Sequence, residues 1–202
     1  VAGNTIGAGI FLAPNLVACH AVALTGEDIA LLQAHEVKVS HNPESNMKLA
    51  SGVAPVPDLL AAGVCVGLGT DGCASNNNLD MFAEMRLAAL LAKGAGGDPT
   101  LLPARVALEM ATIRAARALG LEDRIGSLAP GKRADMTAVH LEAPELLPCY
   151  DPLSHLVYAA GREHVTHVWV DGEQVVDRGQ LTRLDPRELA TKAAYWKEKI
   201  RG

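Results

Sequence analysis

The sequence predicts an α/β fold with a parallel sheet, followed by a smaller part rich in β-structure. Three apolar runs, at residues 15–20, 37–41 and 64–71, each end in a polar residue and lead into a loop and a helical segment. Strands that alternate with helices in this way form βα units, and the strands of such units lie parallel. After residue 125 the pattern changes to turn-rich segments and a β-hairpin. We therefore expect two parts, residues 1–125 and 126–202.

The composition is typical of a globular protein with an aliphatic core. Of the 202 residues, 49% are hydrophobic and 20% are charged, and only 3% are aromatic. The net charge of −5, without a cluster of Lys or Arg, argues against a nucleic-acid partner. Lys, Asp, Glu or Pro interrupts every long apolar run, so we expect no membrane contact.

The start of the chain and its cysteines indicate the compartment. Residues 1–12 are apolar but lack a basic region, so no signal peptide is expected, and the chain begins with Val1 rather than Met, as a piece of a longer protein would. The four cysteines show no CxxC spacing. Three of them lie in or beside strand-like segments, where free, buried cysteine is usual, which indicates a reducing, cytoplasmic compartment.

The first two strand-like runs both end in a histidine. Residues 15–20 end in His20, and a helix is expected soon after it, with Thr25 as its N-cap and Asp28 completing a capping box. The second run ends in His41 and leads into a polar segment that Pro43 interrupts, so this segment is expected to begin as a loop. A short helix is expected from Pro55 to Ala62, ended by Gly63.

The third run ends in Asp71, within the turn Gly69-Thr70-Asp71-Gly72. Taken alone, an aspartate in an ordinary strand-to-helix turn explains this stretch as well as a functional site does. In a parallel sheet, however, the C-terminal strand ends share one rim, and sites are built there. A single histidine at a strand end is more often structural. The succession of His20, His41 and Asp71 favours a site.

The remaining elements follow from turn signals and helical spacing. Helices are expected at residues 79–93 and 103–119, a strand at 136–140, and a short helix at 152–159. A hairpin is expected from arms at 165–170 and 173–176, joined at Asp171-Gly172, and a last helix at 186–201. His164 and His167 lie on this hairpin or at its edge and are expected to be solvated.

Two motifs carry a resemblance to a known family. The stretch SHNPESNMKL at residues 40–49, with Ala54-Pro55, and the stretch GTDGCASNN at residues 69–77 resemble the metal-dependent amidohydrolase superfamily. The branch most similar holds 5′-methylthioadenosine/S-adenosylhomocysteine deaminases and triazine chlorohydrolases. Residues 126–135 resemble the connector that leaves the barrel in such enzymes. The resemblance implies the last three βα units of a TIM-type (β/α)8 barrel, followed by strands of a small β-sandwich and a C-terminal helix.

The resemblance also implies roles for single residues. Asp71 matches the aspartate after the eighth barrel strand, which binds the catalytic metal and accepts a proton from the metal-bound water. His20 matches the catalytic histidine after the sixth strand, which contacts the substrate or the attacking water. Ser75 falls where family members contact substrate, and His41 and Asn42 match the loop after the seventh strand, with a substrate-binding role. The implied cofactor is one divalent metal, Zn²⁺, whose bound water loses a proton near pH 7.

The implied reaction is hydrolytic deamination of an adenine nucleoside, S-adenosylhomocysteine or 5′-methylthioadenosine, by a homo-oligomeric enzyme. Deamination or dechlorination of another heterocycle, such as guanine or a triazine, is an alternative, as is a non-catalytic chain that acts through assembly. The family also needs an HxH pair and an HxxE motif from earlier strands. The chain has no HxH, and its one HxxE, His41 to Glu44, lies in the wrong element. We therefore expect a C-terminal fragment that is inactive alone.

Overall fold

A three-stranded parallel sheet forms the centre of the larger part of the molecule. The computed structural model describes residues 16–201, so the expected absence of a signal peptide in residues 1–12 lies outside the described residues. The strands are β1 (Val17–Cys19), β2 (Lys38–His41) and β3 (Val66–Leu68), in the order β1-β2-β3, and both pairs are parallel. The predicted βα layout is confirmed.

Helices follow the strands as the sequence predicts, with one correction in the second unit. Helix α1 (Gly26–Ala34) has the expected capping box of Thr25 and Asp28. Helix α2 (Pro43–Lys48) begins directly after β2, so the expectation of a loop there is wrong. Proline fits the first helical position because an N–H group there would have no partner within the helix, so its absence costs nothing. The fixed φ of proline also suits a helix.

Capping residues lie at the boundaries of the next two helices. Helix α3 (Val56–Ala61) is followed by Gly63, which has a φ of +82°. Helix α4 (Met81–Gly96) begins after Asp80, whose carboxylate accepts hydrogen bonds from the backbone N–H groups of the first turn, and it ends at Gly97 in the left-handed region. The predicted helix at residues 79–93 is therefore confirmed, with boundaries shifted by two or three residues.

The helix expected over residues 103–119 is two helices. Helix α5 (Ala104–Ala111) and helix α6 (Ile113–Ala118) are separated at Thr112, whose backbone angles of φ −128° and ψ −100° are not helical. The Thr112 hydroxyl donates to the Leu108 carbonyl at 2.7 Å, a local bond that is known to bend helices. The break lets α6 pack on the sheet, where a Cβ added at Gly67 would lie 2.8 Å from the Ala115 Cα.

A second sheet follows, with four antiparallel strands in the order β4-β5-β6-β7. Its strands are β4 (Met136–Val139), β5 (Val165–Val170), β6 (Glu173–Asp177) and β7 (Gln180–Leu181). The predicted hairpin is confirmed, because Asp171 and Gly172 join β5 and β6 with φ values of +53° and +81°. Two positive φ values in a two-residue turn match the twist of the flanking strands.

The connection between β4 and β5 contains a buried histidine. It carries the 3₁₀ turns η1 (Pro144–Leu146) and η2 (Arg162–His164), with α7 (Pro152–Tyr158) between them. The expectation of a solvated His164 is wrong: its side chain is 7% exposed, and it bonds to Glu145 Oε1 at 3.0 Å. A buried polar ring needs such a partner, and sequence spacing does not reveal it.

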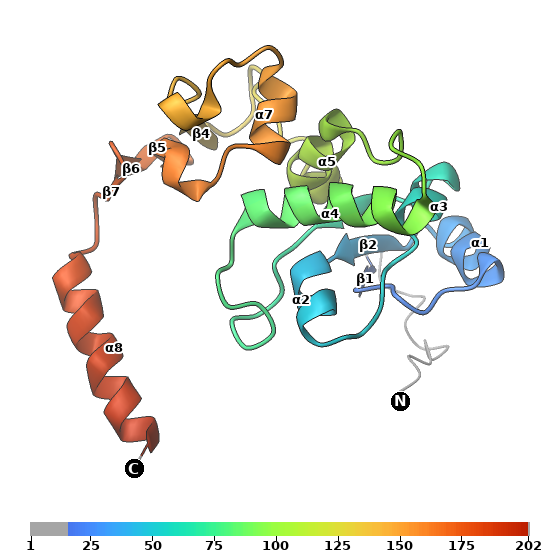
Figure 1. Ribbon diagram of the computed structural model, residues 1–202, viewed down its shortest axis with the longest axis horizontal. Coiled ribbons are helices and arrows are strands. Elements are labelled where there is room, and N and C mark those ends of the chain that lie inside the picture. The colour runs from blue at the N-terminus through green and yellow to red at the C-terminus, as the bar shows by residue number, and fades with distance from the viewer. Residues whose placement is uncertain (1–15, 202) are drawn as a thin grey trace.

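The core is formed by the parallel sheet, by α1 and α3, and by helices α4, α5 and α7, which lie side by side (Figure 1). Its fully buried members are aliphatic, as the composition predicts: Val39, Val56, Leu59, Val66, Ala89, Ala107, Met110 and Val157. Among residues 16–201, no helix is both long and apolar enough to span a bilayer. All four cysteines are free, but Cys19, at the end of β1, and Cys73, in the turn after β3, are exposed rather than buried.

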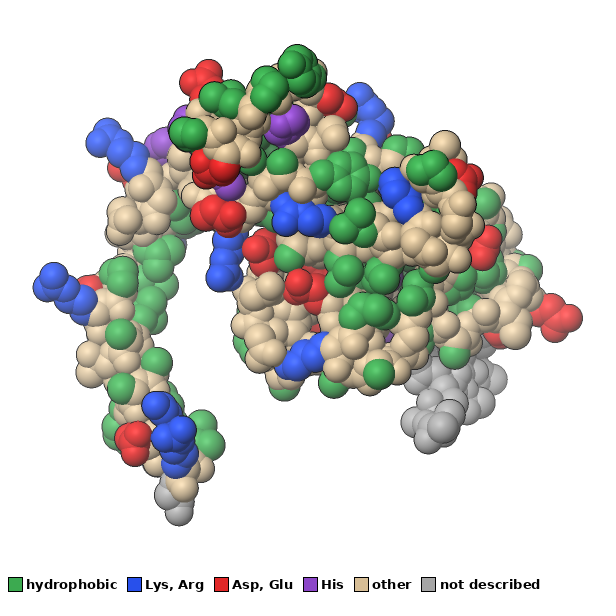
Figure 2. Space-filling view, in the orientation of Figure 1, with side chains coloured by type: hydrophobic (Ala, Val, Ile, Leu, Met, Phe, Trp, Pro, Cys, Tyr) green, Lys and Arg blue, Asp and Glu red, His purple; other side chains and the backbone are tan. Residues whose placement is uncertain are grey.

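The last helix, α8 (Pro186–Arg201), is predicted correctly but stands away from the rest of the chain (Figure 1). None of its residues, all within the described range, is buried. Apolar side chains along it remain in contact with solvent (Figure 2): Leu189, Tyr195, Trp196 and Ile200.

Candidate functional site

The C-terminal ends of the three parallel strands bring the predicted residues to one rim. His20 directly follows β1, His41 is the last residue of β2, and Asp71 comes three residues after β3. Backbone hydrogen bonds continue past the strands, from His20 N–H to the Ser40 carbonyl and from Gly69 N–H to the His41 carbonyl. His20 and Asp71 have φ values of +69° and +61°, so both leave the extended conformation at the rim. Residues in this region of backbone space cluster at functional sites.

His20 faces Asp71 and is oriented by a neighbour on α2. The His20 Nε2 lies 3.8 Å from Asp71 Oδ2, and its Nδ1 lies 2.8 Å from Asn46 Oδ1. Because a carbonyl oxygen only accepts, the Nδ1 atom carries the proton in this bond. A neutral His20 ring therefore presents the lone pair of Nε2 towards the Asp71 carboxylate.

Asp71 is held by two serine hydroxyls. Ser75 Oγ and Ser45 Oγ donate to Asp71 Oδ2 at 2.5 Å and 2.7 Å. These two bonds, with a backbone N–H contributed by Gly72, lower the pKa of Asp71 to about 2. Hydrogen bonds to the charged form favour ionisation, so Asp71 is a carboxylate at neutral pH, able to bind a cation or accept a proton.

His41 and Asn42 are buried beside this group rather than open to solvent. Their exposed fractions are 2% and 5%. Burial, and secondarily the nearby His20, lowers the pKa of His41 to about 4, so its ring is neutral at pH 7. Among the described residues, His41 Nδ1 and Asn46 Nδ2 have no hydrogen-bond partner. Leaving a buried polar atom without a hydrogen-bond partner costs free energy.

Two residues that touch the site were missed by the sequence analysis. Ser45 and Asn46 contact Asp71 and His20, and both are fully buried on α2. They lie within the quoted motif at residues 40–49. They could have been found if Pro43 had been interpreted as the first residue of a helix rather than as part of a loop. In such a helix, Asn42, Ser45 and Asn46 lie on one face, because they have the i, i+3, i+4 spacing.

A second polar cluster, also missed, lies at the start of α4. The carboxylate of Glu84, a fully buried residue, accepts from the Glu44 N–H at 3.1 Å and from Asn76 Nδ2 at 2.7 Å. Burial, assisted by the neighbouring Glu44 carboxylate, raises the pKa of Glu84 to about 7 against the opposing effect of its hydrogen bonds. In the sequence, the only sign of this cluster is a glutamate among apolar residues at the start of the helix, in the stretch MFAEM at residues 81–85.

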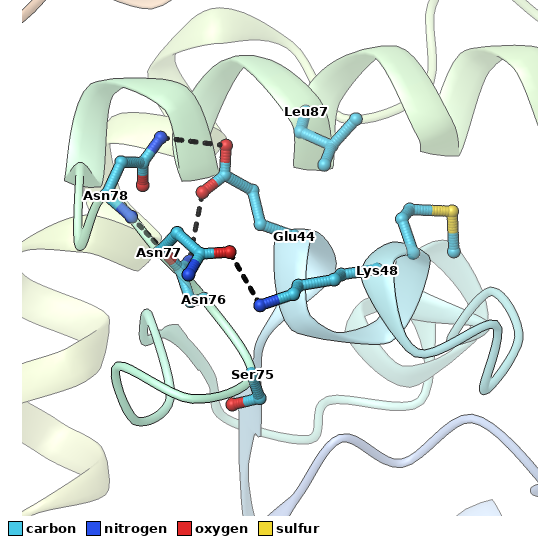
Figure 3. Close-up of a pocket in the computed structure, with 8 residues that line it drawn as sticks. Glu44, Lys48, Ser75, Asn76, Asn77, Asn78 and Leu87 are labelled. Atoms are coloured by element: carbon cyan, nitrogen blue, oxygen red, sulfur yellow. Dashed lines mark hydrogen bonds between the residues drawn. The ribbon is translucent and has the colours of Figure 1, made fainter. Parts of the chain in front are cut away.

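A cavity of about 340 Å³ extends from Ser75 between α2 and the start of α4 (Figure 3). Its lining comprises Glu44, Met47, Lys48, Ser75, Asn76, Asn77, Asn78 and Leu87. The Lys48 ammonium spans it to reach the Ala74 carbonyl at 2.8 Å and Asn77 Oδ1 at 2.6 Å. The loop after β3 is thus fastened to α2 on the solvent side as well as in the interior.

The described residues at the rim are of the types that bind zinc, but too few of them lie together to form a zinc site. A carboxylate and an imidazole are groups that Zn²⁺ binds, and a catalytic zinc site takes three or more protein ligands. Within residues 16–201, however, His, Cys, Asp and Glu form no group of three that could hold a metal. A metal at Asp71 would therefore need further ligands from outside the described residues.

Comparison with known proteins places this geometry in a family. The profile of the amidohydrolase family matches residues 5–175. The chain is 52% identical, over 184 residues, to the 5-methylthioadenosine/S-adenosylhomocysteine deaminase of Syntrophobacter fumaroxidans. It is 50% identical, over 190 residues, to the 5′-deoxyadenosine deaminase of Methanosarcina acetivorans. These alignments cover 91% and 94% of the chain, but the chain spans only 42% and 44% of the relatives' lengths.

Solved structures agree with the sequence relatives. An adenosine deaminase from Xanthomonas campestris with bound zinc superposes with a TM-score of 0.90 at 48% identity, over 92% of this chain and 42% of that one. An atrazine chlorohydrolase from Arthrobacter aurescens complexed with zinc has a TM-score of 0.81 at 30% identity, over 89% and 40% of the two chains. These neighbours imply a TIM-barrel-type fold of which this chain spans a part, and the resemblance noted in the sequence is confirmed: the chain belongs to the amidohydrolase family.

Proposed function

We propose that this chain is the C-terminal part of a zinc-dependent deaminase that hydrolyses the amino group of an adenine nucleoside, S-adenosylhomocysteine or 5′-methylthioadenosine. The observation that carries the proposal is an ionised Asp71, held by two serines and facing His20, at the strand ends of a chain about half identical to deaminases. On this proposal, β1, β2 and β3 are the sixth to eighth strands of the barrel.

The proposed layout divides the chain at residue 125. Residues 1–125 belong to the barrel, and residues 126–202 form the connector, strands of a β-sandwich and the C-terminal helix. The four-stranded antiparallel sheet supports the second part. Helix α7 belongs to the second part by sequence and packs on α4 and α5 of the first, so the two parts share a boundary rather than a flexible linker.

Each rim residue has a proposed task. Asp71 binds the metal and accepts a proton, while His20 contacts the substrate or the attacking water through Nε2. Ser75, His41 and Asn42 contact the substrate or shape its pocket. A bound zinc ion supplies water whose pKa is lowered to about 7. The remaining zinc ligands lie outside the described residues.

Deamination or dechlorination of another heterocycle is a second candidate function. The match to an atrazine chlorohydrolase at a TM-score of 0.81 supports it, because that structure, which covers 89% of this chain, is named for dechlorination rather than deamination. We further propose a cytoplasmic homo-oligomer. The four free cysteines support the compartment, and among the described strands β1 and β3 each pair on one side only, which supports association.

The test uses the longer protein that carries this chain and the 202-residue chain itself. For both, we measure zinc content, ammonia release from S-adenosylhomocysteine and methylthioadenosine, and the release of ammonia and of chloride from a chlorinated triazine. We expect stoichiometric zinc and ammonia release for the longer protein and neither for the chain alone. Stoichiometric zinc with turnover in the isolated chain would contradict the fragment interpretation, and release of chloride alone would select the dechlorination alternative.

Asp71→Asn in the longer protein tests the assignment of the rim. Loss of a metal ligand and proton acceptor is expected to lower kcat by about 10³-fold or more. Asp98→Asn is the matched control, because Asp98 is also an aspartate held by a neighbouring hydroxyl, that of Thr100, but it lies in a surface turn. Asp98→Asn should retain full activity; near-normal activity of Asp71→Asn would refute the role of Asp71.

A further inference from the structure

The fully buried carboxylate of Glu84 stands between the two segments that supply the serine donors to Asp71. We propose that Glu84 is a positioning residue, which fixes Ser45 and Ser75 on Asp71 by joining helix α2 to the loop after β3. The inference rests on the role proposed for Asp71 and adds a residue that touches neither substrate nor metal.

On the α2 side, Glu84 serves as a helix cap supplied from another element. The first residue of α2, Pro43, has no N–H, and among the described residues the N-cap Asn42 makes no side-chain capping bond. Glu84 Oε2 accepts the first N–H that the helix offers, that of Glu44, at 3.1 Å. A carboxylate at a helix N-terminus is favourable for both hydrogen bonding and the helix dipole. This bond fixes the residue directly before Ser45.

On the loop side, Glu84 acts through Asn76. Glu84 Oε1 accepts from Asn76 Nδ2 at 2.7 Å, and the same amide donates to Glu44 Oε2 at 2.9 Å. Asn76 Oδ1 accepts the backbone N–H groups of Asn78 and Leu79 at 3.1 Å and 2.9 Å. All four hydrogen-bonding positions of the Asn76 amide are therefore used, which fixes the residue directly after Ser75.

The chemistry of the cluster argues against simple packing. Two carboxylates, of Glu44 and Glu84, converge on one amide, and one of them is fully buried. An apolar residue in that space would avoid the free-energy cost of burying an ionisable group beside another acid. What the acid contributes, and an apolar residue would not, is simultaneous acceptance from α2 and from the loop. Ser45 and Ser75, which both donate to Asp71 Oδ2, thereby acquire a common anchor.

The test compares Glu84→Ala, Asn76→Ala and the double variant in the longer, zinc-loaded protein. Each single variant is expected to lower kcat per bound zinc by about 10- to 100-fold, the usual loss when a supporting residue behind a metal ligand is removed. The kcat per bound zinc of the double variant should be no lower than that of the more impaired single variant, because Glu84 and Asn76 act through the same connection. Glu84→Gln, which keeps one acceptor oxygen, should fall between Glu84→Ala and the wild type.

Met85→Ala is the matched control, because Met85 is the buried neighbour on the same helix and belongs to the core. It should lower the melting temperature without changing kcat per bound zinc. The inference is overturned if Glu84→Ala behaves like Met85→Ala, or if the losses of the two single variants multiply in the double. If Glu84→Ala does not fold, Asn76→Ala and Glu84→Gln still decide the question.

The outcome is separable from that of the proposed function. If Asp71→Asn remains active, the proposed function fails whatever Glu84 does. If Asp71→Asn is inactive while Glu84→Ala and Asn76→Ala keep full kcat per bound zinc, only the positioning role of Glu84 fails.

Discussion

Hydrogen bonds set the charge state of Asp71, whereas burial sets that of His41. Asp71 is ionised because two serine hydroxyls and a backbone N–H donate to it, and its side chain remains one-third exposed, at 34%. His41 is neutral because it is buried, and among the described residues its Nδ1 has no partner. At pH 7 the rim therefore combines an ionised carboxylate after β3 with a neutral imidazole at the end of β2.

The buried His41 predicts a specific loss of stability in acid. Its pKa is lowered from 6.5 to about 4 in the folded chain, so the unfolded chain binds the proton more readily. Stability from this group is complete above pH 6.5 and is lost as the pH falls towards 4, by on the order of 3 kcal/mol at most. Urea unfolding of the chain between pH 4 and 7 measures it.

His41→Gln is the comparison for that experiment, because other groups also titrate in acid. The difference in the free energy of unfolding between pH 7 and pH 4 should be smaller in His41→Gln than in the wild type. Equal pH dependence in the two proteins would show that His41 titrates normally in the folded chain.

At the scale of elements, the close contact between β3 and α6 fixes the strand that precedes Asp71. The contact requires Gly67, because a Cβ there would lie 2.8 Å from the Ala115 Cα and 3.3 Å from its backbone nitrogen. Both α5 and α6 contact β3, and the break at Thr112 changes the direction of the chain between these two contacts. The position of the rim therefore depends on small residues at one strand–helix crossing.

Gly67→Ala should destabilise the fold by about 1–3 kcal/mol, because the backbone of α6 must shift to admit the methyl group. Gly94→Ala is the matched control: Gly94 lies inside α4, and no described heavy atom outside its own helix turn lies within 4 Å of the added Cβ. That change should stabilise the fold by about 0.5–1 kcal/mol. Chemical unfolding of both variants gives the comparison, and equal stabilities would contradict the close contact.

At the scale of the whole molecule, the chain is a packed body with a projecting helix (Figure 1). One core joins the parallel sheet to α4, α5 and α7, whereas no residue of α8 within the described range is buried. Isolated helices of this length are marginal in water, so α8 adds little to the stability of the chain as it stands.

Deleting residues 185–202 should therefore leave the thermal unfolding of the chain unchanged to within about 2 °C. Val157→Ala is the positive control, because Val157 is fully buried on α7 in the core and its truncation should cost about 2 kcal/mol. A drop in melting temperature on deletion as large as that of Val157→Ala would show that α8 packs on the molecule.

Local patterns in the sequence determined most of the elements of this protein. The strands, the Thr25 capping box, the Asp171-Gly172 hairpin and the last helix follow from apolar runs, helix caps and turn residues, which act between near neighbours. The rim residues His20, His41 and Asp71 were found for the same reason, because strand ends are legible in sequence and parallel strands share an edge.

Only the tertiary structure decided what surrounds that rim. The Ser45 bond to Asp71, the Asn46 bond to His20 and the bond from Glu44 N–H to Glu84 join residues 26 to 40 positions apart, and no local pattern encodes such contacts. The break at Thr112 and the burial of His164 were missed because packing, rather than propensity, selects them. Short-range rules placed Asp71 at a strand end, and the nearby Ser75 contributes most to its ionisation; long-range contacts added Ser45 and His20 as neighbours.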